Sequence, residues 1–133
     1  MATAEFKYNP ELLPVVRAWW GDRHLGAMPP ELLPPCGMCA LDPAGDPVAA
    51  GWLYEPRGAV AFIDWLIAKP GMTAAQTRRA LRAVAFALEN IAISGGYRWI
   101  MGSVCNPVML RECLAVGYEP AAEGVWHLTK KIR

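Results

Sequence analysis

The order of apolar and amphipathic segments in the C-terminal half constrains the fold most strongly. An apolar stretch at 59 to 69 precedes a helical pattern at 74 to 94, and a second apolar stretch at 97 to 104 precedes a short helical pattern at 107 to 116. Two strands joined by a long helix are typical of a parallel pair, because a helical crossover returns the chain to the starting end of the sheet. The sequence therefore predicts such a pair, with ligand-facing groups where the second strand ends.

The segment before this unit predicts antiparallel strands. Residues 37 to 41 and 48 to 54 are apolar and prone to form strands, and residues 42 to 47 between them are rich in proline, glycine and aspartate. Together with the first apolar stretch above, these segments form a predicted meander of three antiparallel strands. The proline-rich segment at 28 to 35 predicts a surface loop, which either lines a binding cleft or only connects elements. A last strand is expected at 125 to 131.

Capping residues mark the ends of two predicted helices. Asn9 precedes a proline, so a first helix is expected from about residue 10 to residue 20. Thr73 can cap the long helix, and Gly95 would end it.

Composition limits the classes of function. The chain has 133 residues, of which 54% are hydrophobic, which predicts a single domain, 1–133, around one core. A net charge of +1 provides no strong electrostatic field for nucleic acid, so strong binding to nucleic acid is not expected. No apolar run reaches the roughly 18 residues of a membrane span, and the N-terminus lacks the apolar core of a signal peptide. A cytoplasmic protein without a membrane partner is expected.

The four cysteines allow two readings. Cys36 and Cys39 form a C-x-x-C motif, which could bind zinc or perform redox chemistry. However, Cys105 and Cys113 do not form a second such pair, and the motif opens a strand-like stretch rather than a helix. The alternative is that the cysteines are small apolar residues of the core. No metal is expected.

Taken in order, these segments resemble the GNAT superfamily, the Gcn5-related N-acyltransferases, over residues 5 to 132. The matching landmarks are the hairpin, the strand that ends at Pro70, the long helix, the strand before Asn106, and Gly117-Tyr118, where the family commonly has Gly-Phe. More narrowly, the chain is similar to short GNAT-like proteins encoded by bacteriophages, which would place it in the host cytoplasm. The resemblance implies an α/β (α+β) fold with a mixed, mostly antiparallel central sheet flanked by helices.

The resemblance also implies acetyl-CoA or another acyl-CoA as cosubstrate. Its pantetheine would pair with the strand backbone at 64 to 66, and its pyrophosphate would lie on the N-terminus of the long helix. The loop there departs from the family pattern, because Gln76 and Arg78 stand where the family has glycines. The arginines could bind phosphate directly or could be ordinary solvated surface. The implied cofactor-binding residues are Trp65, Leu66, Thr73, Ala74, Ala75, Gln76, Thr77, Arg78, Arg79 and Asn106.

The implied reaction is direct attack of a substrate amine on the thioester carbonyl, which needs a base and an acid for the leaving thiolate. Asp64 is the lone acidic residue of its strand and the candidate base, although a buried Asp bonded to a neighbouring loop explains it equally well. The family commonly has a Tyr seven residues after the Asn, and Cys113 stands there instead. Tyr118 or Tyr97 could supply the proton, and Cys113 is either an acyl-accepting thiol or a core residue.

The leading function is therefore acyl transfer from acyl-CoA to the amine of a small molecule or peptide. One alternative is a GNAT-fold protein without catalysis, acting as a binding or virion-associated module of a phage. Another is acyl transfer to an amino-modified nucleobase of phage DNA. Trp20 and Trp52 could form an apolar acceptor pocket or a protein interface, and His24 could line the acceptor side. A homodimer through the C-terminal strand is a further expectation.

Overall fold

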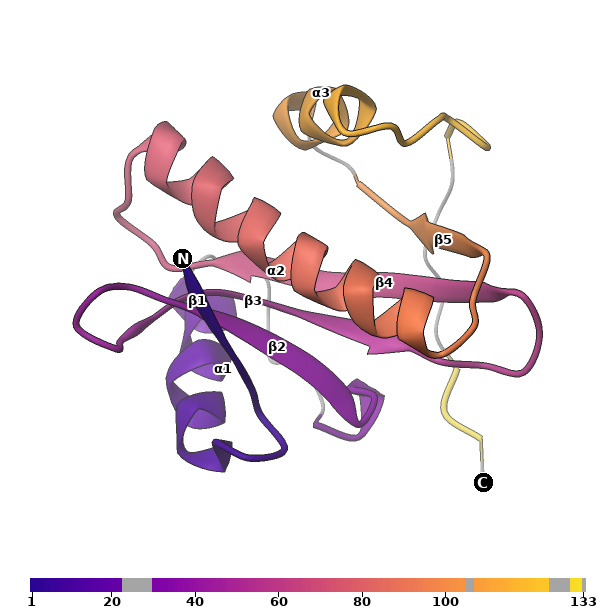
Figure 1. Ribbon diagram of the computed structural model, residues 1–133. Coiled ribbons are helices and arrows are strands. Elements are labelled where there is room, and N and C mark those ends of the chain that lie inside the picture. Colours follow the sequence, from indigo (N-terminus) through magenta and orange to yellow (C-terminus); the bar gives the residue numbers. More distant parts are fainter. Residues whose placement is uncertain (23–29, 105–106, 125–129, 133) are drawn as a thin grey trace. The chain divides into compact units, whose positions relative to one another are not determined.

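The computed structural model describes residues 1–22, 30–104, 107–124 and 130–132. The chain forms two compact units, Met1–Ser103 and Val104–Arg133, which are described separately. The elements of the first unit are β1 (Ala2–Glu5), η1 (Pro10–Leu12), α1 (Leu13–Asp22), η2 (Pro30–Leu32), β2 (Cys36–Leu41), β3 (Pro47–Tyr54), β4 (Val60–Ala68), α2 (Ala74–Ser94) and β5 (Trp99–Gly102) (Figure 1). The second unit contains α3 (Pro107–Ala115).

The five strands form one mixed sheet in the order β1-β2-β3-β4-β5. Strands β1 to β4 pair in antiparallel fashion, whereas β4 and β5 are parallel. Helix α2 makes the crossover that a parallel pair requires (Figure 1). The predicted mixed, mostly antiparallel sheet with one helical crossover is therefore confirmed.

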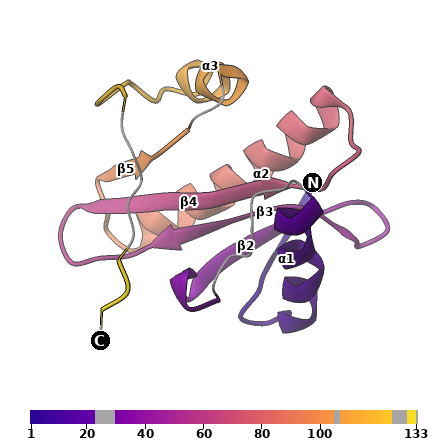
Figure 2. The ribbon, with the colours of Figure 1, turned by 180° about the vertical axis from the view of Figure 1, so that it is seen from behind.

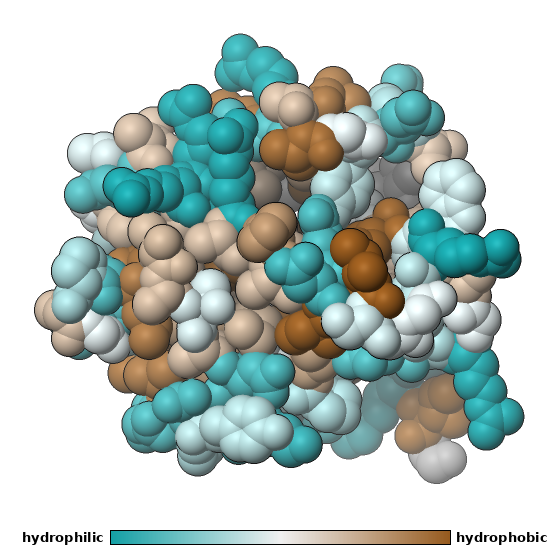
Figure 3. Space-filling model, viewed as in Figure 1, coloured by the Kyte–Doolittle hydropathy of each residue, from teal (hydrophilic) through white to brown (hydrophobic). Residues whose placement is uncertain are grey.

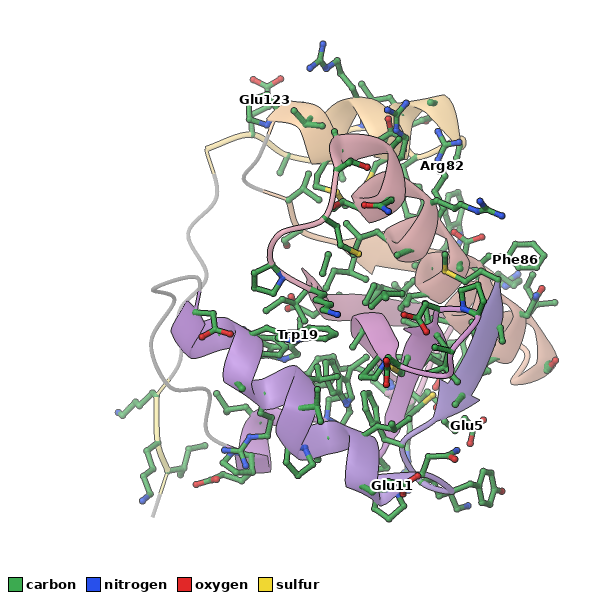
Figure 4. The ribbon with its side chains drawn as sticks, turned by 90° about the vertical axis from the view of Figure 1, so that its left-hand side faces the viewer. Glu5, Glu11, Trp19, Arg82, Phe86 and Glu123 are labelled. Atoms are coloured by element: carbon green, nitrogen blue, oxygen red, sulfur yellow. The ribbon has the colours of Figure 1, made fainter. Side chains whose placement is uncertain are left out.

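Helices α2 and α1 cover opposite faces of the sheet (Figures 1 and 2). A core of side chains lies between each helix and the sheet. The α2-side core consists of Met38, Ala40, Val48, Ala49, Leu53, Ala61, Ile63, Ala68, Ala80, Val84, Leu88 and Ala92. The α1-side core consists of Phe6, Val16, Trp19, Trp20, Cys39, Ala50, Trp52 and Ile67. In Figure 4, Trp19 points from α1 toward the sheet, as this second core requires.

Helix α2 places small side chains against the sheet. Its fully buried positions recur every fourth residue, at Ala80, Val84, Leu88 and Ala92, as expected for one face of an α-helix. Leu81 and Ile91 are partly buried beside this row. Alanines at two of the four positions leave little side-chain volume between the helix and the strands.

The strands differ from the sequence prediction at both edges of the sheet. Strand β1 was not expected, so the antiparallel run contains four strands and not three. Strand β5 is shorter than the predicted 97 to 104 and is not buried, since Trp99 is 68% exposed and Met101 46% exposed. The reason is that β5 has only β4 beside it among the described residues, and α2 covers a single face of the sheet.

The first helix begins differently from the prediction. A single 3₁₀ turn, η1, precedes α1, which extends to Asp22. Asn9 is the N-cap residue of η1 and Pro10 follows it, as predicted, but the Asn9 side chain makes no capping hydrogen bond. Its amide instead donates a hydrogen bond back to the Glu5 carbonyl at 3.0 Å. The Asn9 side chain therefore fixes the turn that joins β1 to the helix.

The second unit shows one helix with a defined end. After α3, the Tyr118 N–H donates to the Cys113 carbonyl at 3.0 Å and the Gly117 N–H donates to the Leu114 carbonyl at 3.2 Å. With a φ of +100° at Gly117, this is a Schellman motif, in which glycine adopts the left-handed conformation at low cost. The predicted strand at 125 to 131 lies largely outside the described residues. No helix in the described ranges is both long and apolar enough to cross a membrane.

Candidate functional site

The parallel pairing of β4 and β5 is short. It joins Val60 to Trp99 at one end and Ile63 to Gly102 at the other, whereas β4 continues to Ala68. Figure 2 shows β5 beside only the first part of β4. Among the described residues, no strand pairs with this edge of β4 after Ile63. The second half of β4 therefore presents backbone N–H and C=O groups that an extended ligand can use.

A β-bulge lies in β4 directly after the end of its pairing with β5. Asp64 pairs with Trp52 and Ile67 pairs with Ala50, so two residues of β4, 65 and 66, stand opposite the single residue Gly51. Trp65 has a φ of 58°, the left-handed conformation that is costly for a residue with a large side chain. Bulges of this kind bend a strand and re-aim its side chains.

The bulge also shifts the alternation of side chains along β4. In a regular strand, side chains on the same face are an even number of residues apart. Here Ile63, before the bulge, belongs to the α2-side core, and Leu66, three residues later, packs against the same core. Trp65 and Ile67 pack toward the α1-side core instead. Gly51 makes room for this arrangement, because a Cβ at Gly51 would lie 2.6 Å from Cδ2 of Leu66.

Two hydrogen bonds hold Trp65 in its conformation. Its backbone N–H donates to Oδ1 of Asp64 at 2.8 Å, and its indole Nε1–H donates to the Tyr54 hydroxyl at 2.6 Å. The Tyr54 hydroxyl in turn donates to the Leu32 carbonyl in η2 at 2.6 Å. This chain of contacts ties the proline-rich segment to the bulge, and the half-buried Asp64 is part of it. The predicted base thus lies at the irregular point of the strand, bonded to the neighbouring backbone.

The N-terminus of α2 is capped as the sequence predicts. Thr73 Oγ1 accepts from the Gln76 N–H at 3.2 Å, and the Gln76 side chain accepts from the Thr73 N–H at 2.9 Å, which together form a capping box. The next amide, that of Thr77, donates to the Thr73 carbonyl. In the part of the chain that the structure describes, the N–H groups of Ala74 and Ala75 donate to no protein acceptor, so these two are available to an anion.

Arginine side chains follow these two amides along α2. An open hollow of about 320 Å³ is lined by Ala75, Arg78, Arg79 and Arg82. Figure 3 shows hydrophilic side chains gathered over the first turns of α2, at the upper left of the view. In Figure 4, Arg82 projects outward from the helix. Two of these arginines were predicted as phosphate ligands, and the structure brings them together with Arg82.

The sequence reasoning missed two residues of this region. Arg82 stands three and four residues after the predicted arginines, and this helical spacing alone could have revealed it. Tyr54 contacts Trp65 across eleven positions of sequence, and no local pattern signals that contact.

Two other predicted site residues, Cys113 and Tyr118, belong to the second unit. Cys113 lies in α3 and is half-buried, and Tyr118 is half-buried directly after the helix. Asn106 lies outside the described residues, as do Cys105 and His24. Residues 64 to 66 and the start of α2 are thus assembled within the first unit.

The C-x-x-C cysteines are separated by the sheet. Cys39 is buried in the α1-side core, whereas Cys36 packs against the α2-side core, so the two thiols lie on opposite faces and cannot share an ion. Burial raises the pKa of the Cys39 thiol to about 12. Burial, and then the neighbouring Glu55 carboxylate, raise the pKa of Cys36 to about 12. Among the described residues, no group of three His, Cys, Asp or Glu side chains is placed to hold a metal ion. This geometry fits the interpretation of Cys36 and Cys39 as small apolar residues of the core.

The predicted acceptor pocket at Trp20 and Trp52 is wrong. Both indoles are almost completely buried in the α1-side core, at 6% and 2% exposure. Their ring centroids lie 6.0 Å apart, and Phe6 stacks on Trp52 at 5.1 Å. Gly37 leaves the space that the Trp52 ring fills. These tryptophans join the helix layer to the sheet and cannot line an open pocket.

Comparisons with known proteins identify the fold. No family model and no curated protein sequence matches this chain. Solved structures do match: the aminoglycoside N-acetyltransferase AAC(6')-Iy in complex with CoA has a TM-score of 0.66 at 13% identity, covering 98% of this chain and 100% of that one. The chain has an acetyltransferase fold.

Two further structures agree. An acetyltransferase from Trypanosoma brucei gives a TM-score of 0.68 at 16% identity, over 97% of this chain and 99% of the other. An aminoglycoside acetyltransferase from an uncultured soil metagenomic sample gives 0.63 at 16% identity, over the whole of both chains. The predicted GNAT-like fold is therefore confirmed.

Proposed function

We propose that this chain transfers an acyl group from acyl-CoA to an amine. The observation that carries the proposal is the second half of β4, which continues beyond the end of its pairing with β5 and leads through a short turn into the start of α2. A pantetheine arm contains amides that can pair with strand backbone, and the diphosphate that follows it needs N–H donors and cations. One continuous segment, from Asp64 to Arg82, offers both. The likeness to acetyltransferase structures supports the same cosubstrate.

In this proposal, Asp64 is the general base. The substrate nitrogen attacks the thioester carbonyl carbon, the C–S bond breaks, the nitrogen proton passes to the Asp64 carboxylate, and the departing sulfur takes a proton from an acid. We assign the acid to Tyr118, with the Cys113 thiol as the alternative, and assign cofactor binding to Asn106 in addition to the first-unit residues. The capped start of α2 would hold the diphosphate through Ala74 and Ala75.

The acceptor is proposed to be a primary amine of a small molecule or peptide. Two of the similar structures are aminoglycoside acetyltransferases by name, so aminoglycosides are the first acceptors to screen. Polyamines and peptide N-termini follow.

Calorimetric titration with acetyl-CoA and with CoA tests the cosubstrate. We expect saturable binding at modest salt. No binding up to millimolar ligand would refute the proposal. Binding without CoA release in the presence of any amine would instead favour the noncatalytic binding module.

The Asp64→Asn variant tests the base once an acceptor is found. Asparagine keeps an oxygen that can accept the Trp65 N–H, so the bulge should persist while the basic group is lost. We expect kcat to fall by about 10²-fold or more with acetyl-CoA affinity unchanged. Asp46→Asn, which changes an exposed carboxylate of the hairpin turn, is the matched control. Full turnover in Asp64→Asn would remove Asp64 from the mechanism.

The Tyr118→Phe variant tests the acid. If Tyr118 protonates the thiolate, this variant loses turnover with its affinity for acetyl-CoA unchanged, whereas Cys113→Ser retains turnover. The reverse pattern would assign the acid to Cys113.

A further inference from the structure

The pairing of the strands shows on which face of the sheet Asp64 lies. Before the bulge, Ala61 and Ile63 belong to the α2-side core, so the alternate residues of β4 point to the other face. Asp64 pairs with Trp52, which is buried in the α1-side core. Because paired residues of neighbouring strands share a face, Asp64 lies on the α1 side of the sheet.

Apolar and aromatic side chains adjoin Asp64 on this face. Phe62 precedes it by two residues in β4 and pairs with Tyr54 of β3 on one side and Met101 of β5 on the other. Trp99, two residues before Met101, lies on the same face of β5. We call Phe62, Trp99 and Met101 the β4–β5 apolar surface.

The β4–β5 apolar surface is exposed. Phe62 is 39% exposed, Met101 46% and Trp99 68%. From β4, the α1-side core includes Ile67, which follows the bulge, and Trp65 packs against that core. In Figure 2, α1 and β5 lie at opposite sides of the view. The apolar surface therefore begins where the cover of α1 ends.

The charge on these strands limits what can bind beside Asp64. Asp64 is the only charged residue of strands β2 to β5. Glu55, directly after β3, interacts with Cys36, which packs against the α2-side core on the other face. A ligand with several ammonium groups would press most of them against apolar side chains, which costs free energy because the charges lose hydration. A ligand with one amine and an apolar body would instead bury carbon surface there.

We propose that the acceptor is an arylalkylamine, a primary monoamine joined by a short alkyl chain to an aromatic ring, and that Phe62 and Met101 select it. This inference rests on the proposed function and deepens it, because it names the acceptor class. The amine nitrogen lies at Asp64, and the ring of the acceptor lies against Phe62 and Met101, where an aromatic contact adds to the buried area. Aminoglycosides and polyamines, which carry several ammonium groups, are poorer acceptors.

The test compares kcat/KM for 2-phenylethylamine and ethylamine, which differ only in the phenyl ring, by the release of CoA from acetyl-CoA. We expect the wild type to prefer 2-phenylethylamine by about tenfold or more, and to use it better than kanamycin or spermidine. Phe62→Ala should lower this preference several-fold with its affinity for acetyl-CoA unchanged. Phe86→Ala, which removes a ring that is 67% exposed on α2, is the matched control and should keep the preference.

The preference is a ratio of two rates on the same preparation, so a smaller folded fraction in a variant cannot imitate its loss. Met101→Ala removes a second side chain of the apolar surface and should also lower the preference. An unchanged preference in both Phe62→Ala and Met101→Ala, or an equal loss for both amines, overturns the inference.

The remaining outcomes separate this inference from the proposed function. Equal use of the two amines by the wild type, or better use of kanamycin or spermidine, overturns the inference and leaves the proposed function in place. Failure to bind acetyl-CoA, or binding without turnover of any amine, overturns both.

Discussion

Substituting Gly51 by alanine should destabilise the protein by forcing the bulge in β4 to move. The added Cβ would lie 2.6 Å from Cδ2 of Leu66, 3.0 Å from Cγ1 of Val84 and 3.4 Å from Cδ1 of Leu88. The first two distances are shorter than ordinary carbon contacts, which lie near 3.5–4.0 Å. Val84 and Leu88 are fully buried, so they have little room to withdraw.

The expected cost combines two opposing terms. Overpacking a dense core typically costs about 1–3 kcal/mol. Replacing glycine by alanine also restricts the unfolded chain, which returns about 0.4–1 kcal/mol. We therefore expect the free energy of unfolding of Gly51→Ala to fall by about 1–2 kcal/mol. Urea denaturation monitored by tryptophan fluorescence measures it, because several indoles lie in the α1-side core.

A matched glycine and a double variant sharpen the test. Gly21 lies in α1, and a Cβ added there would meet nothing within 4 Å, so Gly21→Ala should raise the stability by about 0.5–1 kcal/mol. Removing the clashing atoms with Leu66→Ala should make the double variant less destabilised than the sum of its parts. A Gly51→Ala protein as stable as the wild type, or strict additivity with Leu66→Ala, would refute the steric reasoning.

Two other perturbations follow from the same structure. Tyr54→Phe leaves the Trp65 indole N–H without its acceptor and should lower the free energy of unfolding, measured by urea denaturation, by about 1–3 kcal/mol. Tyr8→Phe, at a position that is 72% exposed, is the control and should leave it almost unchanged. Equal effects of the two substitutions would contradict the role given to the Tyr54 hydroxyl. Burial raises the pKa of Cys36 and Cys39 in the folded protein to about 12, whereas thiols of the unfolded chain ionise near 9. Above pH 9 the unfolded chain therefore binds fewer protons than the folded one, so the free energy of unfolding should fall between pH 9 and 12. A constant free energy of unfolding over this range in the wild type, or the same fall in a Cys36→Ala/Cys39→Ala variant, would contradict this.

Local signals determined which elements the sequence could predict. The bounds of α2 follow from a capping threonine and a terminal glycine, and both act within a few residues of the helix end. The hairpin of β2 and β3 was equally accessible, because Asp42 and Gly45 form its turn through local hydrogen bonds. Such features depend on neighbouring residues, so their physical cause can be read from a short stretch of sequence.

Features that depend on distant residues were missed or misassigned. Strand β1 is four residues long and forms only by pairing with β2, thirty-odd positions away. The conformation of Trp65 is imposed by its register against β3 and by the Tyr54 hydroxyl, and a tryptophan carries no mark of a positive φ. Trp20 and Trp52 were predicted to form an acceptor pocket or a protein interface, whereas both belong to the α1-side core. The position of Asp64 in the strand was predicted, but its bond to the following amide was not.

Because the bulge shifts the alternation of side chains along β4, the number of residues in this strand matters as much as their composition. Removing one residue at 64 or 65 would take out the bulge and restore strict alternation, with Leu66 and Ala68 still facing the α2-side core and Ile67 the α1-side core. Inserting one residue after the bulge would instead turn all three to the opposite faces. The apolar content of the strand would hardly change, yet both cores would lose their packing at once. An insertion at this point is therefore far less tolerable than most substitutions.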